Sequence, residues 1–236
     1  MNHSLQKGFT KKIYHKLMGF YDNSMRKYSI KSYSQEGEDM ILRRLFSSKT
    51  KGFYVDVGAH HPFRFSNTYY FYKRGWNGIN IDAMPGSMKL FDKYRPKDIN
   101  LEIPIASQCK KMTYYQFNEP ALNGFVKKLS EKRDNEANNY FIRNTVDLET
   151  KRLDQVFPSF IGEDQCIDFL SIDVEGMDFD VLKSNDWKLY KPNVVLIESL
   201  KTSLSDLADD PITRFLAING YSLFAKTMNT VFYILS

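Results

Sequence analysis

The feature of this sequence that most limits its fold is a series of short apolar runs separated by helical patterns. The first two runs cover residues 53–57 and 78–82, and helical patterns follow them around residues 66–74 and 85–94. Runs this short and apolar are typical of strands that are buried on both faces. Because strand and helix alternate, the sequence predicts a parallel sheet with helices on both of its faces.

The rest of the chain extends this alternation and ends it with a hairpin. We expect further strands over residues 101–106, 112–117, 167–172 and 193–197, further helices over residues 126–137, 178–184 and 205–218, and a terminal hairpin of residues 221–226 and 230–234. Pro104 favours an edge or irregular position for the third strand. Residues 118–150 are polar and fit no simple strand–helix repeat. The predicted fold is an α/β, Rossmann-like, doubly wound seven-stranded sheet with a C-terminal antiparallel hairpin.

The N-terminal region differs from the rest of the chain in its charge. Residues 1–31 contain seven Lys or Arg and one acidic residue, whereas the remaining chain has 26 basic and 27 acidic residues. We predict a basic arm over residues 1–32, with an amphipathic helix within residues 8–28, and one domain over residues 33–236. Such an arm could contact an anionic membrane surface or another copy of the chain. The domain shows no basic stripe, which argues against nucleic-acid binding.

The cysteines and the hydropathy of the sequence indicate where the protein works. Cys109 and Cys166 lie far apart and form no CxxC pair, so the sequence suggests neither a zinc site nor a disulfide framework. No segment approaches the roughly 20 apolar residues of a membrane span. The N-terminus also lacks the compact apolar run of a secretion signal. We therefore expect a cytoplasmic protein.

The turn after the first strand has the composition of a ligand-binding crevice. Asp56 lies one residue before the end of the strand, and Gly58-Ala59 would allow the backbone to approach a ligand closely. The dinucleotide fingerprint G-x-G-x-x-G is missing here, and no phosphate-binding G-x-x-x-x-G-K-[ST] occurs in the chain. The sequence therefore argues against a nicotinamide oxidoreductase and favours a ligand without a pyrophosphate, such as S-adenosylmethionine.

Acidic side chains end three of the other predicted strands. Asp82 ends the second strand, where a carboxylate can accept hydrogen bonds from both ribose hydroxyls of a nucleoside. Asp173 and Glu175 follow the strand at 167–172, and Glu198 follows the next strand. Carboxylates that converge at one edge of a sheet need a cation, a proton or hydrogen-bond donors. Alternatively, Asp173 caps the next helix and Glu198 pairs with a lysine.

Taken together, these segments resemble the FkbM family of S-adenosylmethionine-dependent methyltransferases. The matching segments are YSQEGED (33–39), YVDVGAH (54–60), INIDA (79–83), RLD (152–154), LSIDVEG (170–176) and LIE (196–198). The resemblance implies a class I methyltransferase fold and O-methylation, often of a sugar hydroxyl in a polyketide or surface glycan. One departure lies in the turn after the first strand, where family members commonly have Asn-x-Gly and this chain has His60-His61-Pro62.

The strand-end positions and the resemblance together predict a cofactor site and a catalytic site. The predicted residues around S-adenosylmethionine are Gln35, Asp56, Gly58, Ala59, His60, Asp82, Ala83, Ala106, Ser107 and Asp173. A sugar hydroxyl is a poor nucleophile at neutral pH, so a base or a metal is expected. His60 is a further candidate base, and we predict Asp173, Glu175 and His61 as catalytic. Mg or Mn held by Asp173, Glu198 and a histidine is a second option.

Residues 118–150 and the acceptor leave several alternatives open. This insertion would cover the cofactor edge if it folds as a lid, with aromatic side chains that could stack on a sugar ring: Tyr114, Tyr115, Phe125 and Tyr140. The same aromatics could instead pack the insertion against the sheet. An N-methyltransferase for nucleic-acid bases would carry an Asn- or Asp-Pro-Pro-aromatic motif where this chain has Asp173-Val174-Glu175-Gly176. A non-catalytic S-adenosylmethionine-binding scaffold and a methyltransferase for another small molecule are the alternatives.

Overall fold

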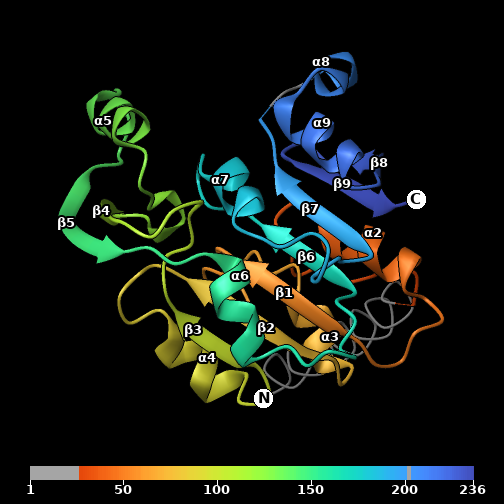
Figure 1. Ribbon diagram of the computed structural model, residues 1–236. Helices are drawn as coiled ribbons and strands as arrows, with labels where there is room; N and C mark the ends of the chain where they lie inside the picture. The colour runs from red at the N-terminus through yellow and green to blue at the C-terminus, as the bar shows by residue number, and fades with distance from the viewer. Residues whose placement is uncertain (1–26, 201–202) are drawn as a thin grey trace, which may run out of the picture. The chain divides into compact units, whose positions relative to one another are not determined.

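The computed structural model describes residues 27–200 and 203–236, and Figure 1 shows how their elements are arranged. The chain divides into two compact units, Met1–Ser32 and Tyr33–Ser236, and the elements below belong to the second. The amphipathic helix predicted within residues 8–28 falls almost entirely on residues 1–26, which lie outside the described residues. Within the described ranges, no helix combines the length and the apolar character needed to cross a membrane.

A seven-stranded sheet forms the centre of the second unit. Its strands, in spatial order, are β3 (Ile99–Glu102), β2 (Asn77–Asp82), β1 (Phe53–Val57), β6 (Phe169–Ile172), β7 (Val194–Glu198), β9 (Thr230–Leu235) and β8 (Tyr221–Lys226). The first five are parallel to one another, and β9 runs antiparallel to both β7 and β8. This order confirms the predicted doubly wound, Rossmann-like sheet with a C-terminal antiparallel hairpin.

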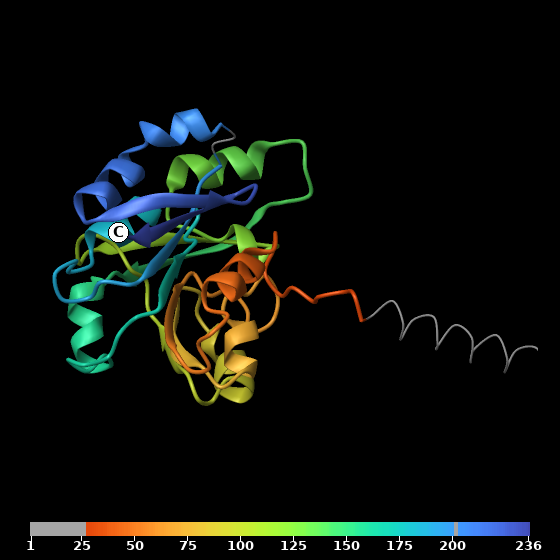
Figure 2. The same ribbon diagram turned by 90° about the vertical axis from the view of Figure 1, so that its right-hand side faces the viewer.

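Helices cover both faces of this sheet, as its apolar strands require. One face is covered by α2 (Glu38–Leu45), α3 (Tyr69–Lys73) and α4 (Met88–Tyr94), and the other by α6 (Leu153–Val156), α7 (Asp178–Lys183), α8 (Leu204–Ala208) and α9 (Pro211–Ile218). Successive side chains of β1 point to opposite faces of the sheet and join different hydrophobic clusters. Val55 belongs to the cluster that includes Leu153 of α6, and Tyr54 belongs to the cluster that includes Phe71 of α3. Figure 2 shows the sheet between the orange and yellow helices and the teal helix α6.

The polar insertion forms a small substructure of its own. Residues 118–150 contain the 3-10 helix η1 (Pro120–Leu122), α5 (Lys127–Asn135) and β5 (Ile142–Glu149), and β4 (Lys111–Phe117) directly precedes them. β4 and β5 pair antiparallel in a separate two-stranded sheet, which Figure 1 shows beside the carboxyl ends of β1 and β2. The sequence predicted β4 and α5 but missed β5, because the exposed positions of this strand are charged or polar and blur its alternation.

Two predicted elements differ from the observed ones at prolines. The strand predicted over 101–106 ends at Glu102, and Ile105 makes only an isolated bridge with Lys151. Pro104 has no backbone N–H to donate, which is consistent with the strand ending before it. The helix predicted over 205–218 is two helices, because Asp210 caps a new helix that begins at Pro211.

Candidate functional site

A cavity of about 200 Å³ opens at the carboxyl edge of the parallel strands. Its floor comes from the ends of β1, β2, β6 and β7, and its opposite wall comes from the insertion. The lining residues are Gln35, Val57, Gly58, His60, Phe65, Ile81, Asp82, Ala83, Ile103, Pro104, Ile105, Tyr114, Pro120, Ala121, Leu122, Asn123, Gly124, Phe125, Asp173, Val174, Glu175, Met177 and Glu198. This is the position at which doubly wound sheets bind their ligands.

Gly58 brings two walls of the cavity together. It has a φ of 86°, and a side chain added there would lie 1.7 Å from the carbonyl oxygen of Asp173. The amide of Asp173 donates a hydrogen bond to the carbonyl of Val57 at 3.0 Å. Glycine is therefore required because the turn after β1 packs directly on the loop after β6, a reason different from the predicted close approach to a ligand.

Asp82 lies at the end of β2. Its carboxylate binds the turn that follows β1 and the turn that follows β2. One carboxylate oxygen accepts the amide of His60 at 2.9 Å, and the other accepts the amide of Met84 at 2.8 Å. Burial raises the pKa of Asp82, and the two amide hydrogen bonds oppose this shift. Each oxygen keeps a second lone pair, so the carboxylate can also accept hydrogen bonds from a ligand in the cavity.

The backbone around the cavity is strained at three residues. His60, Phe65 and Glu175 have φ values of 53°, 56° and 55°, and all three line the cavity. Among the described residues these are the only ones other than glycine with a positive φ. Such conformations cost about 1–3 kcal/mol each and are concentrated at functional sites. The distribution of strain therefore independently indicates that this cavity is the working part of the protein.

Three carboxylates converge on the far side of the cavity. Oxygens of Asp173, Glu175 and Glu198 lie within 4.8 Å of one another. Arg133 of α5 forms a 2.6 Å ion pair with Glu175, and it is also the cation that acts on Glu198, where a lysine was the alternative expected. Within the described residues, Asp173 and Glu198 form no ion pair of their own, which is the arrangement that requires a proton, a cation or a donor.

The electrostatics of Asp173 and Glu198 follow from this crowding. Asp173 is exposed to the open cavity, but protein atoms surround its carboxyl group on the other sides. This burial and the charge of Glu198 raise the pKa of Asp173 well above its usual range. Burial and the charge of Glu175 raise the pKa of Glu198 in the same way. Both acids therefore hold a proton more readily than an ordinary carboxylic acid, and a proton or a cation between them would relieve their repulsion.

Asp178, rather than Asp173, holds the loop that leads into α7. Its two carboxylate oxygens accept the amides of Val174 and Gly176, each at 3.2 Å. Met177 is the N-cap residue of α7 and no side chain makes a capping hydrogen bond there, so Asp173 does not cap this helix. The carboxyl group of Asp173 is left facing the cavity.

The YSQEGED segment attaches the cavity to the C-terminal hairpin. Glu36 accepts the amide of Asn229 at 2.7 Å, and Glu38, which is buried, accepts the hydroxyls of Thr227 and Thr230 at 3.0 and 3.2 Å. These contacts fix Gln35, whose side chain lines the cavity. The acids of this motif therefore hold the segment in place, and the glutamine is its residue at the site.

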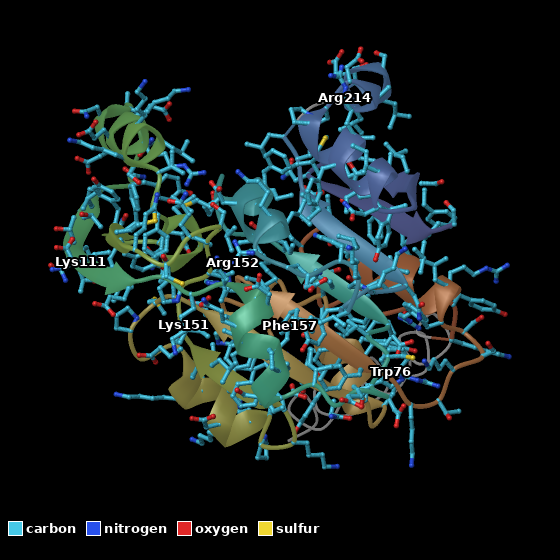
Figure 3. All side chains as sticks on the ribbon, in the orientation of Figure 1. Trp76, Lys111, Lys151, Arg152, Phe157 and Arg214 are labelled. Atoms are coloured by element: carbon cyan, nitrogen blue, oxygen red, sulfur yellow. The ribbon has the colours of Figure 1, made fainter. Side chains whose placement is uncertain are left out.

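The RLD segment fixes the apolar wall that follows β3. Arg152 donates to the carboxylate of Asp154 and to the carbonyl of Ser107, and Lys151 accepts the amide of Ala106 at 2.9 Å. Figure 3 shows Lys151 and Arg152 where the chain passes from β5 into α6. The side chains that reach the cavity from this wall are those of residues 103–105.

Comparison with known proteins identifies the family. Residues 56–223, more than two thirds of the chain, match the sequence profile described as Methyltransferase FkbM domain. The chain belongs to the FkbM methyltransferase family. No curated protein sequence gives a significant match. The protein is thus a methyltransferase, and its family implies S-adenosylmethionine as the methyl donor.

The structure brings most of the predicted site residues of this FkbM methyltransferase to the cavity. The predicted residues that line it are Gln35, Gly58, His60, Asp82, Ala83, Asp173, Glu175 and Glu198, and those that do not are Asp56, Ala59, His61, Ala106 and Ser107. Asp56, Ala59 and Ala106 are buried and take no part in the cavity lining. His61 holds a turn, because its Nδ1 accepts the amides of Phe63 and Arg64, each at 3.1 Å. This arrangement does not favour His61 as a base.

Several lining residues of the FkbM methyltransferase were missed or misplaced by sequence reasoning. Tyr114 and Phe125 line the cavity as expected of the insertion, with ring centroids 4.8 Å apart, whereas Tyr115 and Tyr140 do not. Phe65 lines the cavity and carried no predicted role. The run of aromatic residues in the loop after β1 was the available signal, but nothing in the sequence tells which of those rings faces a ligand.

Proposed function

We propose that this methyltransferase transfers a methyl group from S-adenosylmethionine to a hydroxyl of a sugar-like acceptor. The observation that carries the proposal is the placement of Asp82 and the pair Asp173–Glu198 around one cavity at the carboxyl edge of the sheet. One carboxylate suits a nucleoside, and the other two suit the removal of a hydroxyl proton. The resemblance to the FkbM family supports the sugar-like class of the acceptor.

The residues present fit the methyl donor. Asp82 offers acceptor lone pairs for ribose hydroxyls, and the amide side chain of Gln35 offers both donors and acceptors for an amino-acid group. The apolar residues Ile103, Ile105 and Leu122 supply walls for a flat base. When bound, S-adenosylmethionine supplies an electrophilic methyl group on a positively charged sulfur. An acidic cavity favours that charge over an uncharged product.

Asp173, supported by Glu198, is the proposed base for the acceptor hydroxyl. A base works best when its pKa lies near the pH of the reaction, and burial together with neighbouring carboxylates raises both pKa values from the usual acidic range. Glu175 suits this role less well, because Arg133 pairs with it at 2.6 Å. Holding the hydroxyl oxygen against such a base in a fixed position could supply on the order of 7–11 kcal/mol of the barrier.

Binding and transfer experiments test this proposal separately. Calorimetry with S-adenosylhomocysteine should give binding heat for the unaltered protein, and Asp82→Asn should weaken the affinity about 10- to 100-fold, because a charged acceptor of two hydroxyls is lost. Asp92→Asn on α4, outside the cavity, is the matched control. Incubation with labelled S-adenosylmethionine and a panel of methyl glycosides should then give labelled ethers.

Each outcome of these experiments has a distinct meaning. No heat with S-adenosylhomocysteine would contradict the donor assignment. Binding without transfer to any glycoside, amine or phenol would favour the non-catalytic scaffold instead. Transfer to an amine or phenol alone would keep the donor site and replace the acceptor class.

We also propose that the reaction takes place in the cytoplasm. Cys109 and Cys166 are both exposed and neither is in a disulfide, which suits a reducing compartment. Fluorescence microscopy of the tagged protein would test this setting.

A further inference from the structure

Phe65 places an aromatic ring in the lining of the cavity. Its side chain lines the cavity and 41% of the residue surface is exposed, although most large aromatic residues of the central sheet are buried. The ring lies nearly parallel to the imidazole of His60, with an interplanar angle of 20° and centroids 6.2 Å apart. Other aromatic residues of the chain are equally exposed, but Phe65 combines this exposure with a place in the cavity lining, where a ligand can cover the ring.

The backbone of Phe65 is held in an unfavourable conformation to achieve this exposure. Its φ of 56° lies in the left-handed region, which a bulky side chain seldom adopts. The residues after it are fixed, since the amide of Ser66 donates to the carbonyl of Tyr33 at 3.1 Å and the Thr68 hydroxyl donates to buried Asp56 at 3.1 Å. Asn67 donates to the hydroxyl of Ser171 at 3.1 Å. The loop is therefore built to hold the ring where it is.

The neighbours of Phe65 connect its loop to the insertion. The guanidinium of Arg64 lies 4.4 Å from the ring centroid and forms an ion pair with Glu119 at 3.1 Å. Glu119 caps η1, whose residues form the opposite wall of the cavity. His60 Nε2 is buried without a hydrogen-bond partner in the described part of the chain, so it can bond a ligand beside the ring.

We infer that Phe65 is the residue that selects the acceptor, by stacking on one face of its ring. The inference rests on the proposed transfer to a hydroxyl and names the side chain that recognises the rest of the acceptor. The electron-rich face of an aromatic ring attracts the C–H groups on one face of a pyranose, while the hydroxyls at the edge of that sugar suit the carboxylates and His60 Nε2. An acyclic polyol offers the same hydroxyls but no flat apolar face.

A fluorescent variant tests the contact without requiring turnover. Trp76 and Trp187 are both buried, so the tryptophan introduced by Phe65→Trp would supply the solvent-exposed part of the emission. Methyl pyranosides should change this emission, and sorbitol at the same concentration should not. S-adenosylhomocysteine should leave the affinity for the pyranoside unchanged or improve it.

Kinetics then separate acceptor recognition from the donor site. Phe65→Ala should raise the KM for the methylated pyranoside roughly three- to tenfold, the size of one ring-stacking contact, and leave the Kd for S-adenosylhomocysteine within about twofold. Phe65→Tyr should restore the KM. Phe160→Ala is the matched control, because Phe160 is 40% exposed and lies outside the cavity lining.

The results distinguish failure of this inference from failure of the proposed function. Loss of S-adenosylhomocysteine affinity in Phe65→Ala, or an unchanged KM together with silent Phe65→Trp emission, would overturn the role of Phe65 while methyl transfer by the unaltered protein continues. Absence of S-adenosylhomocysteine binding by the unaltered protein would instead reject the proposed function. A pyranoside-dependent emission change would even then support the contact with Phe65.

Discussion

In the protein core, Asp98 is surrounded by hydrogen-bond donors, whereas at the cavity the acids Asp173 and Glu198 lie close to each other. Asp98 accepts hydrogen bonds from Tyr54, Gly78, Asn80 and Arg95, all between 2.8 and 3.0 Å. The side chains of Arg95 and Asp98 are both completely buried. At the cavity, by contrast, the cation that acts on Glu198 among the residues in ranges 27–200 and 203–236 is Arg133 of α5, which already pairs with Glu175.

The difference between these two clusters separates structural from functional acids. A buried charge is tolerated in the core when a counter-charge and hydrogen bonds satisfy it, as they do around Asp98. A group of like charges without that compensation raises the energy of the folded protein, and it persists where a ligand or a proton completes it. Removing a carboxylate should therefore have opposite consequences for stability and activity in the two places.

The largest effect is expected at the cavity. Asp173→Asn should lower kcat by about 100- to 10,000-fold, because the proposed base is lost. The free energy of unfolding should not fall, because the substitution removes a repulsion with Glu198. Single-turnover methyl transfer and urea denaturation measure the two quantities. Asp209→Asn, at an exposed ion pair with Arg214, should change neither.

A metal chelator distinguishes a shared proton from a divalent cation at the same acids. If the carboxylates share a proton, EDTA should leave the rate unchanged. A loss of rate that Mg²⁺ or Mn²⁺ restores would assign Asp173 and Glu198 to a metal instead. Full turnover by Asp173→Asn would remove that residue from both roles.

The core cluster should respond through stability. Arg95→Met leaves the carboxylate of Asp98 buried without its cation, and we expect a loss of about 3–5 kcal/mol in the free energy of unfolding. Urea denaturation measures it. Arg214→Met is the control, because this arginine is exposed on α9 (Figure 3) and should contribute at most about 1 kcal/mol. Equal losses in the two variants would remove the contrast between buried and exposed pairs.

The pH dependence of the free energy of unfolding should reveal the titration of Asp56, a buried carboxyl group on which the charge of Arg95 acts. Burial raises its pKa from 3.8 to about 6, against the opposing effects of Arg95 and the hydrogen bond from Thr68. Well below pH 3.8 the group is protonated in both folded and unfolded chains. As the pH rises to about 6 the unfolded chain releases its proton first, so the folded protein loses up to about 3 kcal/mol of stability.

An Asp56→Asn variant isolates this contribution. Its side chain is neutral at every pH, so its stability relative to the unaltered protein should rise between pH 4 and pH 7 by that amount. Urea denaturation of both proteins across this range measures the difference. A difference that stays constant with pH would show that Asp56 titrates normally in the folded protein.

The smallest effect is expected from the cation beside the cavity acids. Arg133 lowers the pKa of Glu198 against the larger effect of burial, so Arg133→Met should raise that pKa further. The acidic limb of the pH profile of kcat/KM should then move to higher pH. Lys132→Met on the same helix removes an exposed pair with Glu136 and should leave the profile in place.

Much of the fold could be predicted because each buried strand leaves a recognisable apolar run in the sequence. The strands at 53–57 and 78–82 were placed to within a residue, since buried parallel strands are continuous apolar runs. β5 escaped because its exposed side chains are polar. The helix predicted over 205–218 is two helices because Asp210 caps a new helix at Pro211, which the apolar pattern hides. Such local effects compete with periodicity and are difficult to weigh without the packing.

The cavity was predictable only in part. Asp82, Asp173 and Glu198 lie at strand ends, and parallel strands bring their ends to one edge of a sheet, so their meeting followed from the sequence. Which neighbours turn inward did not follow. His61 and Phe65 lie four residues apart in one loop, and hydrogen bonds to His61 Nδ1 and the strained φ of Phe65 decide that the phenyl ring faces the cavity.

The amino-acid sequence by itself determined the sheet, its order of alternation and the acids at its rim, because strand period and strand ends are local properties. The tertiary structure decided which acids obtain a cation. Arg95 lies only three residues before Asp98 in the chain, but Arg133 reaches Glu175 from an insertion 42 residues away. Distances between side chains that are remote in the chain set pKa values, and only the folded backbone fixes those distances.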